Sequence, residues 1–580
     1  MGIRVLASIV WGIGTFFVAA PLSAQETVPG EFLVKIKGSA LSPSGSNFRT
    51  KLSSKVSFKS SMDLLNMYAV SLSSAETLEE LRQNPEVEYV EPNYVLKRFV
   101  DEAELAGFSQ EVELSQIQET RGGSQAFGLF SQNSAPLKIT DAWSAMSSSG
   151  ARPIVAVIDS GVDTDHSVFK NSNAIWWNPG EIPGNGVDDD GNGFVDDVNG
   201  WNFISRNSNV FDSEGHGTHV AGIVLGVSMD IFASPLGAAP LQIMPLKFLG
   251  TGGSGSTADA VSAIYYAVNM GARVINASWG GSSYSQALHD ALAFAYSRGV
   301  VVVAAAGNYS KNNDQNPIYP SSLGVPSLAS VAASTNLDAL AAFSNFGNWS
   351  VLLSSPGVGV LSTYPGNQFR SMSGTSMAAP LVAGLAALAF REAPALSGFQ
   401  IRNILAAASP SVPSLSGWVS TGGRIDALAV VQNSIAQKST QAYQPAYSAV
   451  APAGARDPAS SSSSTHQMGG CGLVKNLGSG AWGGGGSLGA LGAVLFALIL
   501  PLVLWLVLRV RVMSRSRRRH DRYVMKSDIK LMVEGREIVG RMQTISAGGL
   551  SFQVDEMLEK GGSVRLQIVS PDGRDQIITE

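Results

Sequence analysis

The chain has 580 residues, with 40 Lys and Arg against 45 Asp and Glu, and its formal net charge at pH 7 is −5. A chain of this length exceeds one ordinary domain, so we expect three or four folded units. The slightly acidic balance excludes wholesale binding of a nucleic-acid polymer. The sequence has a single cysteine, Cys471, which excludes an intramolecular disulfide.

Residues 1–24 have the layout of a secretory signal peptide. Arg4 precedes an apolar run, and small residues precede Gln25. We expect cleavage after Ala24, and the alternative is an uncleaved N-terminal anchor. In both cases the segment that follows is exported.

Residues 25–100 predict a small α+β unit. The runs EFLVKIKG, MYAVSLSS and VEYVEPNYVLKR have strand-like patterns, and SAETLEELRQNP has a helical pattern with Ser74 near its start. Residues 101–135 are polar, and we expect them to form a linker and maturation region.

Residues 136–435 show a different pattern. Apolar runs such as PIVAVID and GVVVVAAAGN alternate with helix-like segments such as TADAVSAIYYAVNMG. This alternation predicts an α/β domain whose parallel sheet is covered by helices on both faces. In such domains the functional groups gather at the carboxyl ends of the strands.

Four polar residues stand where such a sheet would bring them together. Asp159 and Asn308 end apolar runs, while His216 and Ser376 each precede or open a helix-like segment. A serine at a helix start is usually an N-cap, but the same position suits a nucleophile whose oxyanion lies at the helix N-terminus. His216 would accept the proton of the Ser376 hydroxyl. Asp159 would orient the imidazole, and Asn308 would donate to the oxyanion.

The segments VIDSGVD, HGTHVAG, AAAGN and GTSMAAP resemble the four signature segments of the subtilisin family of serine proteases, in the family's order. The resemblance implies a catalytic triad of Asp159, His216 and Ser376. It also implies that Asn308 is the oxyanion donor and that His219 has a structural role. The expected activity is that of a serine endopeptidase that cleaves polypeptides through an acyl-enzyme.

Two further segments resemble the substrate cleft of this family. LGTGGSGS (249–256) resembles the edge strand that binds an extended peptide, and ASWGG (277–281) resembles the opposite wall of the S1 pocket. Trp279 either lies near that pocket or is a core aromatic residue. A largely apolar pocket would favour a bulky apolar side chain at P1.

The end of the N-terminal unit, VEYVEPNYVLKR, resembles the end of the inhibitor-type propeptide of the same family. The resemblance implies that residues 25–100 assist folding, inhibit the protease intramolecularly and are then cut off. Self-cleavage would fall within residues 98–130. The alternative is an accessory domain that stays attached.

An acidic loop, NGVDDDGNGFVDDVNGW, spans residues 185–201. Its carboxylates repel one another unless a hard cation lies among them, and the alternate positions of Asp188, Asp190 and Asn192 match the start of a calcium loop. The expected ligands of a structural calcium ion are Asp188, Asp190, Asn192, Phe194 through its carbonyl, Asp196 and Asp197. The alternative is a solvated acidic turn.

Residues 436–487 are rich in Ser, Ala, Pro and Gly and predict a flexible linker, within which Cys471 resembles part of a bacterial C-terminal sorting tail or is an unmodified thiol. Residues 488–508 are uncharged and apolar, and they are long enough to cross a bilayer core of about 30 Å. Arginines follow this segment, so we expect a single-pass bacterial membrane protein with a periplasmic or extracellular protease domain and a cytoplasmic tail. A buried core helix is the alternative.

Residues 509–580 predict a basic juxtamembrane segment and a small β-barrel-like unit. Arg518 and Arg522 form R-x-x-x-R, and Ser546 and Gly549 lie in TISAGGLSF. These motifs resemble those of PilZ domains, bacterial receptors in which paired arginines clamp cyclic di-GMP. The resemblance implies a nucleotide site at these four residues, while the alternative is that the arginines meet anionic lipid.

Two functions are compatible with these features. The first is an exported, membrane-tethered serine endopeptidase with a cytoplasmic PilZ-like module. The second is a cyclic di-GMP receptor in which the protease domain is secondary.

Overall fold

The computed structural model describes residues 25–38, 55–99, 111–112, 137–147, 150–233 and 235–438, and the backbone of six short strands between 522 and 578. The chain divides into two compact units, Met1–Ala459 and Ser460–Glu580, and each is described by itself. The predicted signal peptide (1–24) and the predicted span (488–508) lie outside the described residues. Among the helices of the described segments, none has both the length and the apolar composition needed to cross a bilayer.

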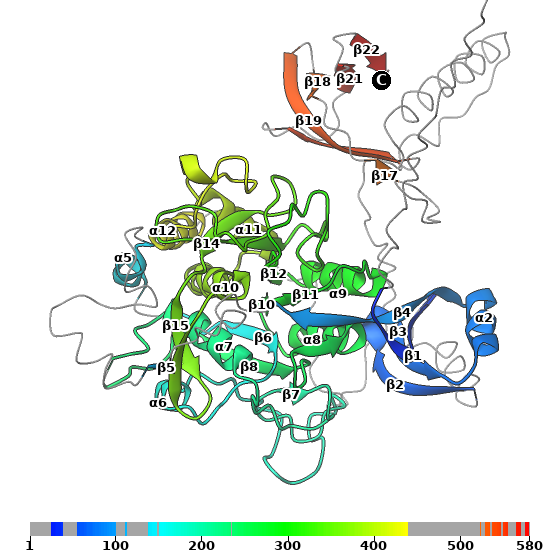
Figure 1. Ribbon diagram of the computed structural model, residues 1–580, viewed down its shortest axis with the longest axis vertical. Coiled ribbons are helices and arrows are strands. Elements are labelled where there is room, and N and C mark those ends of the chain that lie inside the picture. Colours follow the sequence, from blue (N-terminus) through cyan, green and yellow to red (C-terminus); the bar gives the residue numbers. More distant parts are fainter. Residues whose placement is uncertain are drawn as a thin grey trace, which may run out of the picture. The chain divides into compact units, whose positions relative to one another are not determined.

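The first unit is built on a seven-stranded sheet in which all neighbouring strands are parallel (Figure 1). Buried strands of this kind are short and apolar, as predicted for residues 136–435. In spatial order the strands are β14 (Leu353–Pro356), β13 (Leu328–Ser334), β12 (Val301–Ala305), β10 (Val274–Ala277), β6 (Ile154–Asp159), β8 (Gln242–Lys247) and β7 (Trp201–Asn202).

Helices follow most of these strands along the chain. Three of them begin with a serine N-cap whose side chain accepts a backbone N–H: Ser256, Ser285 and Ser397. The α-helices of this region are α5 (Ile139–Ala145), α6 (Ser167–Ser172), α7 (His216–Gly226), α8 (Thr257–Asn269), α9 (Gln286–Ser297), α10 (Thr375–Glu392), α11 (Gly398–Ala407) and α12 (Ala427–Gln437). A short 3-10 turn, η2, covers Pro413–Leu415.

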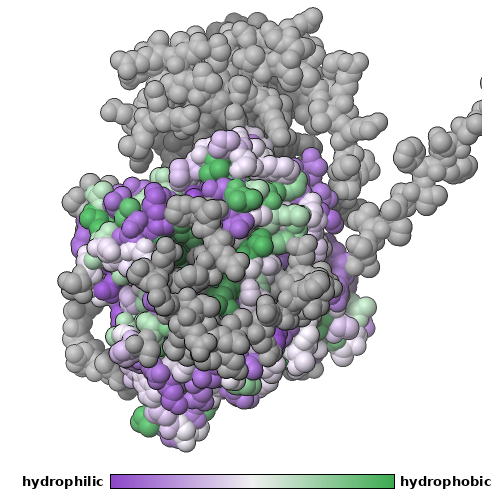
Figure 2. All heavy atoms as spheres, turned by 60° about the vertical axis from the view of Figure 1, so that its left-hand side comes forward, coloured by the Kyte–Doolittle hydropathy of each residue, from purple (hydrophilic) through white to green (hydrophobic). Residues whose placement is uncertain are grey.

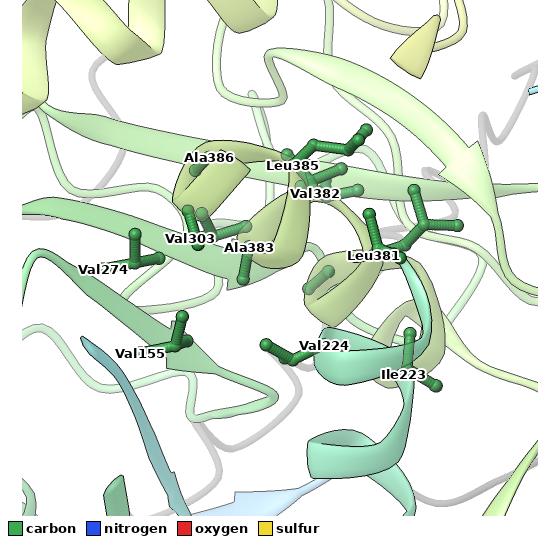
Figure 3. Packing of buried hydrophobic residues seen from close by; sticks show 14 of the residues in the cluster. Val155, Ile223, Val224, Val274, Val303, Leu381, Val382, Ala383, Leu385 and Ala386 are labelled. Atoms are coloured by element: carbon green, nitrogen blue, oxygen red, sulfur yellow. The ribbon is translucent and has the colours of Figure 1, made fainter. Parts of the chain in front are cut away.

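The sheet separates two hydrophobic core clusters. Along β6, Val155 belongs to one cluster and Ala156 to the other, as expected for side chains that alternate across a strand. The first cluster contains residues of α7, α10, α11 and α12, and the second contains residues of α8 and α9. Figure 3 shows Val274 and Val303 on neighbouring strands next to Ala383 of α10. The predicted α/β fold with helices on both faces of a parallel sheet is therefore confirmed.

The N-terminal segment forms an antiparallel sheet with one helix across it. Its elements are β1 (Thr27–Ile36), β2 (Val56–Met62), η1 (Asp63–Leu65), β3 (Met67–Leu72), α2 (Ala75–Gln83) and β4 (Val87–Arg98). One face packs on α2 through residues such as Val34 and Leu81. The other face, which includes Leu33 and Met67, shares the core cluster of α8 and α9.

A smaller sheet of the first unit contains β15 (Val360–Tyr364), β16 (Gln368–Met372) and β5 (Glu111–Val112), paired in that order. Two short strands complete the unit, namely β9 (Ser254–Ser256) and β11 (Trp279–Gly280). Figure 2 shows hydrophobic residues interspersed with hydrophilic ones on one face of the described residues.

The second unit contains β17 (Arg522–Tyr523), β18 (Asp528–Val533), β19 (Arg536–Ser546), β20 (Gly549–Val554), β21 (Val564–Val569) and β22 (Asp575–Ile578). These strands pair antiparallel in the order β17-β19-β18-β21-β22, with β20 on β19. The tail is therefore β-rich as predicted. The pairings among these described strands form an open path, and the expected closure into a barrel is not among them.

Candidate active site

Asp159 and His216 meet at the carboxyl end of the central strand β6. Asp159 is the last residue of β6, and His216 is the first residue of α7. Both side chains are buried, and His216 Nδ1 lies 2.7 Å from Asp159 Oδ1. The backbone N–H of Ser160 donates to the same oxygen at 2.7 Å. These contacts fix the carboxylate and orient the imidazole.

The surroundings of His216 suit a general base. Burial alone lowers the pKa of this imidazole, but the charge of Asp159 and the hydrogen bond to it outweigh burial, so that the pKa of His216 is raised. Its second ring nitrogen, Nε2, is buried and makes no hydrogen bond. The Asp159 contact therefore leaves Nε2 as the nitrogen that can accept a proton.

Ser376 and Asn308 lie at the N-terminus of α10. The Ser376 hydroxyl donates to the carbonyl of Ser278 at 3.1 Å. Asn308 Oδ1 accepts hydrogen bonds from the backbone N–H and the hydroxyl of Thr375, at 2.9 and 2.8 Å. A Cβ atom built on Gly374 would lie 2.9 Å from Asn308 Nδ2. The side-chain amide of Asn308 therefore faces the backbone that leads into Ser376.

Two other residues that the sequence singled out have structural contacts. His219 is fully buried and donates from Nε2 to the carbonyl of Arg370 at 2.8 Å. Burial lowers the pKa of His219 to about 3, so this ring stays neutral. The indole of Trp279 is also fully buried and donates to the carbonyl of Ile158 at 2.8 Å, which places its side chain in the core.

Strand β4 of the N-terminal segment extends onto the protease domain toward β11 (Figure 1). β4 pairs antiparallel with β9 on one edge, where Leu96 lies opposite Gly255. On the other edge it pairs antiparallel with β11, where Arg98 lies opposite Trp279. An extended peptide bound along both edges is recognised by strand addition. The two segments that resemble a substrate cleft therefore bind a strand of the same chain.

Phe99 follows β4, and its side chain fills an apolar space formed with Gly280 and Tyr309. Its side chain is 2% exposed, and its ring meets that of Tyr309 edge-on, with 6.0 Å between centroids. A Cβ atom on Gly280 would lie 2.8 Å from Phe99 Cζ and 3.1 Å from Ile318. The ring of Phe99 therefore packs against the residue that directly follows Asn308 in the sequence.

Comparison with known proteins gives the family. The family model described as the subtilase family matches residues 150–443, about half of the chain. The chain belongs to the subtilase family. Since relatives of known activity align over nearly their whole length, this subtilase is a subtilisin-like serine endopeptidase.

The subtilase is similar to several curated proteases. It is 38% identical to subtilisin DY of Bacillus licheniformis over 279 residues, 48% of this chain and 90% of that protein. It is 33% identical to thermitase of Thermoactinomyces vulgaris over 308 residues, 52% of this chain and 96% of that protein. With subtilisin Savinase of Lederbergia lenta it shares 39% identity over 214 residues, 37% of this chain and 76% of that protein.

Two other parts of the subtilase match families of their own. Residues 17–93 match the fervidolysin N-terminal prodomain, and residues 516–579 match the PilZ domain. The three-part architecture inferred from the sequence, with a prodomain, a subtilase domain and a PilZ domain, is therefore confirmed.

The acidic loop of the subtilase brings three carboxylates together. Oxygen atoms of Glu181, Asp188 and Asp190 lie within 4.8 Å of one another. Carboxylate oxygens at this separation are suited to a hard cation such as calcium. Glu181 was missed in the sequence analysis because it precedes the acidic run of residues 185–201.

The other expected calcium ligands make different contacts. Asp196 accepts the backbone N–H groups of Asn185 and Gly186 at 3.1 and 3.0 Å, which closes the loop. Asp197 is buried and accepts from Tyr266, at 2.5 Å, and from Asn192. The Asn192 Oδ1 atom accepts the N–H of Phe194 at 2.8 Å. Of the expected ligands, Asp188 and Asp190 belong to this carboxylate cluster. The ligand roles expected of Asn192, Phe194, Asp196 and Asp197 stay predictions.

In the tail, the backbone brings three of the four expected nucleotide-binding residues into register. Arg522 of β17 lies opposite Ser546 of β19, and Ser546 lies opposite Gly549 of β20. Arg518 lies outside the described residues.

Proposed function

We propose that Asp159, His216 and Ser376 form the catalytic triad of this endopeptidase. The main support for this assignment is the buried 2.7 Å contact between His216 Nδ1 and Asp159 Oδ1, which leaves His216 Nε2 without a hydrogen bond. In the reaction the Ser376 hydroxyl first gives up its hydrogen bond to the Ser278 carbonyl. It then transfers its proton to His216 Nε2 while Ser376 Oγ attacks the peptide carbonyl. His216 returns that proton to the leaving amine, and water then hydrolyses the acyl-enzyme by the same exchange.

Asn308 stabilises the negative charge of the tetrahedral intermediate in this proposal. Its Oδ1 is held by two donors of Thr375, so its Nδ2 is preorganised at the N-terminus of α10. The backbone N–H of Ser376 is the second donor, and the N-terminus of the helix adds a favourable partial charge.

The N-terminal segment acts as an intramolecular inhibitor and is removed by self-cleavage. The support is the position of β4 between β9 and β11, together with the match to a prodomain family. Arg98 lies opposite Trp279, and the carbonyl of the preceding residue, Ser278, accepts the Ser376 hydroxyl, so Phe99 is the residue whose carbonyl is offered to Ser376. The proposed scissile bond is therefore Phe99–Val100, and the pocket prefers a bulky apolar P1 residue.

Calcium is proposed as a structural ion of the acidic loop, held by Glu181, Asp188 and Asp190. A bound ion would neutralise carboxylates that otherwise repel one another, and it would take no part in peptide cleavage. For the tail, the PilZ match and the Arg522–Ser546 register support binding of cyclic di-GMP.

Export and membrane tethering complete the proposal. The signal-like residues 1–24 and the apolar residues 488–508 with their arginine-rich flank support a protease domain outside the cytoplasm and a tail inside it. Membrane fractionation of the full chain and of a chain that ends before 488 tests the tether. Recovery of both in the same soluble fraction would contradict it.

A covalent probe tests the catalytic assignment. A fluorophosphonate should label the purified full chain at Ser376, and Ser376→Ala should abolish both labelling and self-cleavage. N-terminal sequencing of the processed protein should begin at Val100. Labelling that persists in Ser376→Ala would contradict the triad, and a different N-terminus would contradict the proposed scissile bond.

A further inference from the structure

Arg98, the last residue of β4, forms a partly buried ion pair with Glu214 of the protease domain. Arg98 Nε lies 2.6 Å from Glu214 Oε1, and the two side chains are only 13% and 14% exposed. The stem of Arg98 lies against the backbone of Gly253, where an added Cβ would lie 2.6 Å from Arg98 Cγ. The backbone N–H of Arg98 also donates to the Gly253 carbonyl at 2.8 Å. The backbone, the aliphatic stem and the guanidinium of Arg98 therefore all contact the protease domain.

Glu214 is fixed in place before any peptide binds. Its backbone N–H donates to Asp212 Oδ1 at 3.0 Å, and its carbonyl accepts the Tyr364 hydroxyl at 2.9 Å. Asp212 is itself fully buried and also accepts the hydroxyl of Ser160 at 3.0 Å. These contacts belong to the protease domain alone, so removal of the propeptide leaves the Glu214 backbone where it is.

The carboxylate of Glu214 lacks a full set of partners. Its Oε2 atom is buried and makes no hydrogen bond, and burial raises the pKa of the group even though Arg98 opposes the shift. Shielding an ionised carboxylate from water costs free energy unless a cation pairs with it. When β4 leaves, the position of the Arg98 guanidinium becomes open to a positively charged side chain of a substrate.

The position of Arg98 relative to Phe99 defines which substrate residue would contact Glu214. We propose that Glu214 is a specificity residue that selects Arg or Lys at P2, immediately before the residue whose carbonyl is attacked. This inference rests on the proposed function, in which Phe99 occupies P1. The favoured substrates are extended segments with a basic residue followed by a bulky apolar one, as in the chain's own Lys97-Arg98-Phe99.

Peptide cleavage by the self-processed full chain tests the inference. The substrates are four acetylated p-nitroanilides, Leu-Lys-Arg-Phe and its variants with Lys, Ala or Glu in place of Arg. A charge-assisted contact predicts that kcat/KM for the Arg peptide exceeds that for the Ala peptide about tenfold or more. The Lys peptide should fall between them, and the Glu peptide should be the poorest.

Variants of the enzyme locate the preference. Glu214→Gln should bring the ratio of kcat/KM between the Arg and Ala peptides close to one, and Glu214→Arg should make the Glu peptide the better substrate. Asp165→Asn is the matched control, because this exposed carboxylate pairs with Lys170 at the surface, and it should keep the wild-type ratio. A ratio retained in Glu214→Gln would overturn the inference.

The wild-type comparison decides the question even where a Glu214 variant fails to fold. Equal kcat/KM for the four peptides would overturn the role of Glu214 and leave the proposed endopeptidase intact. Cleavage of none of them would contradict the proposed function and the inference together.

Discussion

Glu91 of β4 accepts the hydroxyl hydrogen of Ser285, the N-cap residue of α9. The same carboxylate accepts the backbone N–H groups of Gln286 and Ala287, at 2.8 and 3.2 Å. A residue of the N-terminal segment thus supplies the anionic acceptor that the first turn of a protease helix requires. The propeptide and the protease domain therefore share a helix cap as well as the cleft.

This shared cap predicts a loss of stability in Glu91→Ala. The variant is made in a Ser376→Ala chain so that the propeptide stays attached. Backbone donors left unpaired at a partly buried helix end cost about 1–3 kcal/mol, which lowers the thermal midpoint of a protein of this size by about 1–3 °C. Differential scanning calorimetry measures the change. Glu88→Ala, exposed on the same strand, is the control, and an equal decrease in both variants would contradict the role of Glu91.

The pH dependence of cleavage follows from the raised pKa of His216. The general base works only when neutral, so kcat/KM should fall as the pH drops through this raised pKa. Asp159→Asn removes the charge that raises it, so the acid limb should move to lower pH. Asp159→Asn should also lower kcat by roughly 10⁴-fold, which is the size of the loss when the triad aspartate of subtilisin is replaced.

Initial rates measured between about pH 5 and 9 give this profile. Asp165→Asn changes the net charge equally but lies on the surface, and it should leave the acid limb in place. An acid limb that does not move in Asp159→Asn would show that another group controls the profile.

Local patterns in the sequence predict the parts of the site that depend on strand and helix ends. Asp159 ends a buried strand and His216 begins a helix, so a parallel sheet brings them to the same edge without further information. The pairing of Arg98 with Glu214 is different, because the register of β4 in the cleft depends on tertiary packing between segments far apart in the chain. No local pattern encodes it.

The acidic loop shows a similar limit. The spacing of Asp188 and Asp190 predicts a calcium loop, but which oxygens face a common point depends on how the loop folds back. Glu181 joins them, whereas Tyr266 and Asn192 bind Asp197. The sequence also left open whether Trp279 lines the S1 pocket or the core. A strand that pairs with a peptide through its backbone can direct its side chains into the core, and the sequence pattern does not show which way they point.

Calcium should stabilise the protease domain through the loop. In the Ser376→Ala chain, calcium at about 100 times its Kd should add about 2.7 kcal/mol to the free energy of unfolding, and chelation should remove this increment. Glu181→Gln should reduce the increment because it removes one of the three clustered carboxylates. Thermal unfolding with and without calcium measures it.

Asp189→Asn provides the matched control within the same loop. Asp189 accepts hydrogen bonds from Ile182 and Asn185, so its replacement should lower stability with and without calcium alike. An increment that is the same in Glu181→Gln as in the parent chain would contradict the cluster as the calcium site.

The tail should bind cyclic di-GMP through its arginine motif. The backbone of Arg522 lies in register with Ser546 of the second motif. In the proposed site the Arg522 guanidinium binds the nucleotide through a charge-assisted contact, which the loss of this side chain should remove. Isothermal titration of the full chain in detergent should detect binding, and Arg522→Ala or Arg518→Ala should weaken it about tenfold or more. Arg565→Ala, an equal change of charge on β21, should alter affinity much less.

The two roles considered for these arginines give opposite results in this experiment. A nucleotide clamp requires the fork geometry of a guanidinium, so Arg522→Lys should bind cyclic di-GMP almost as poorly as Arg522→Ala. A juxtamembrane anchor requires only positive charge, so Arg522→Lys should then retain binding to vesicles that contain anionic lipid. The absence of any heat with cyclic di-GMP, combined with vesicle binding that Arg522→Lys preserves, would reject the nucleotide site in favour of the lipid contact.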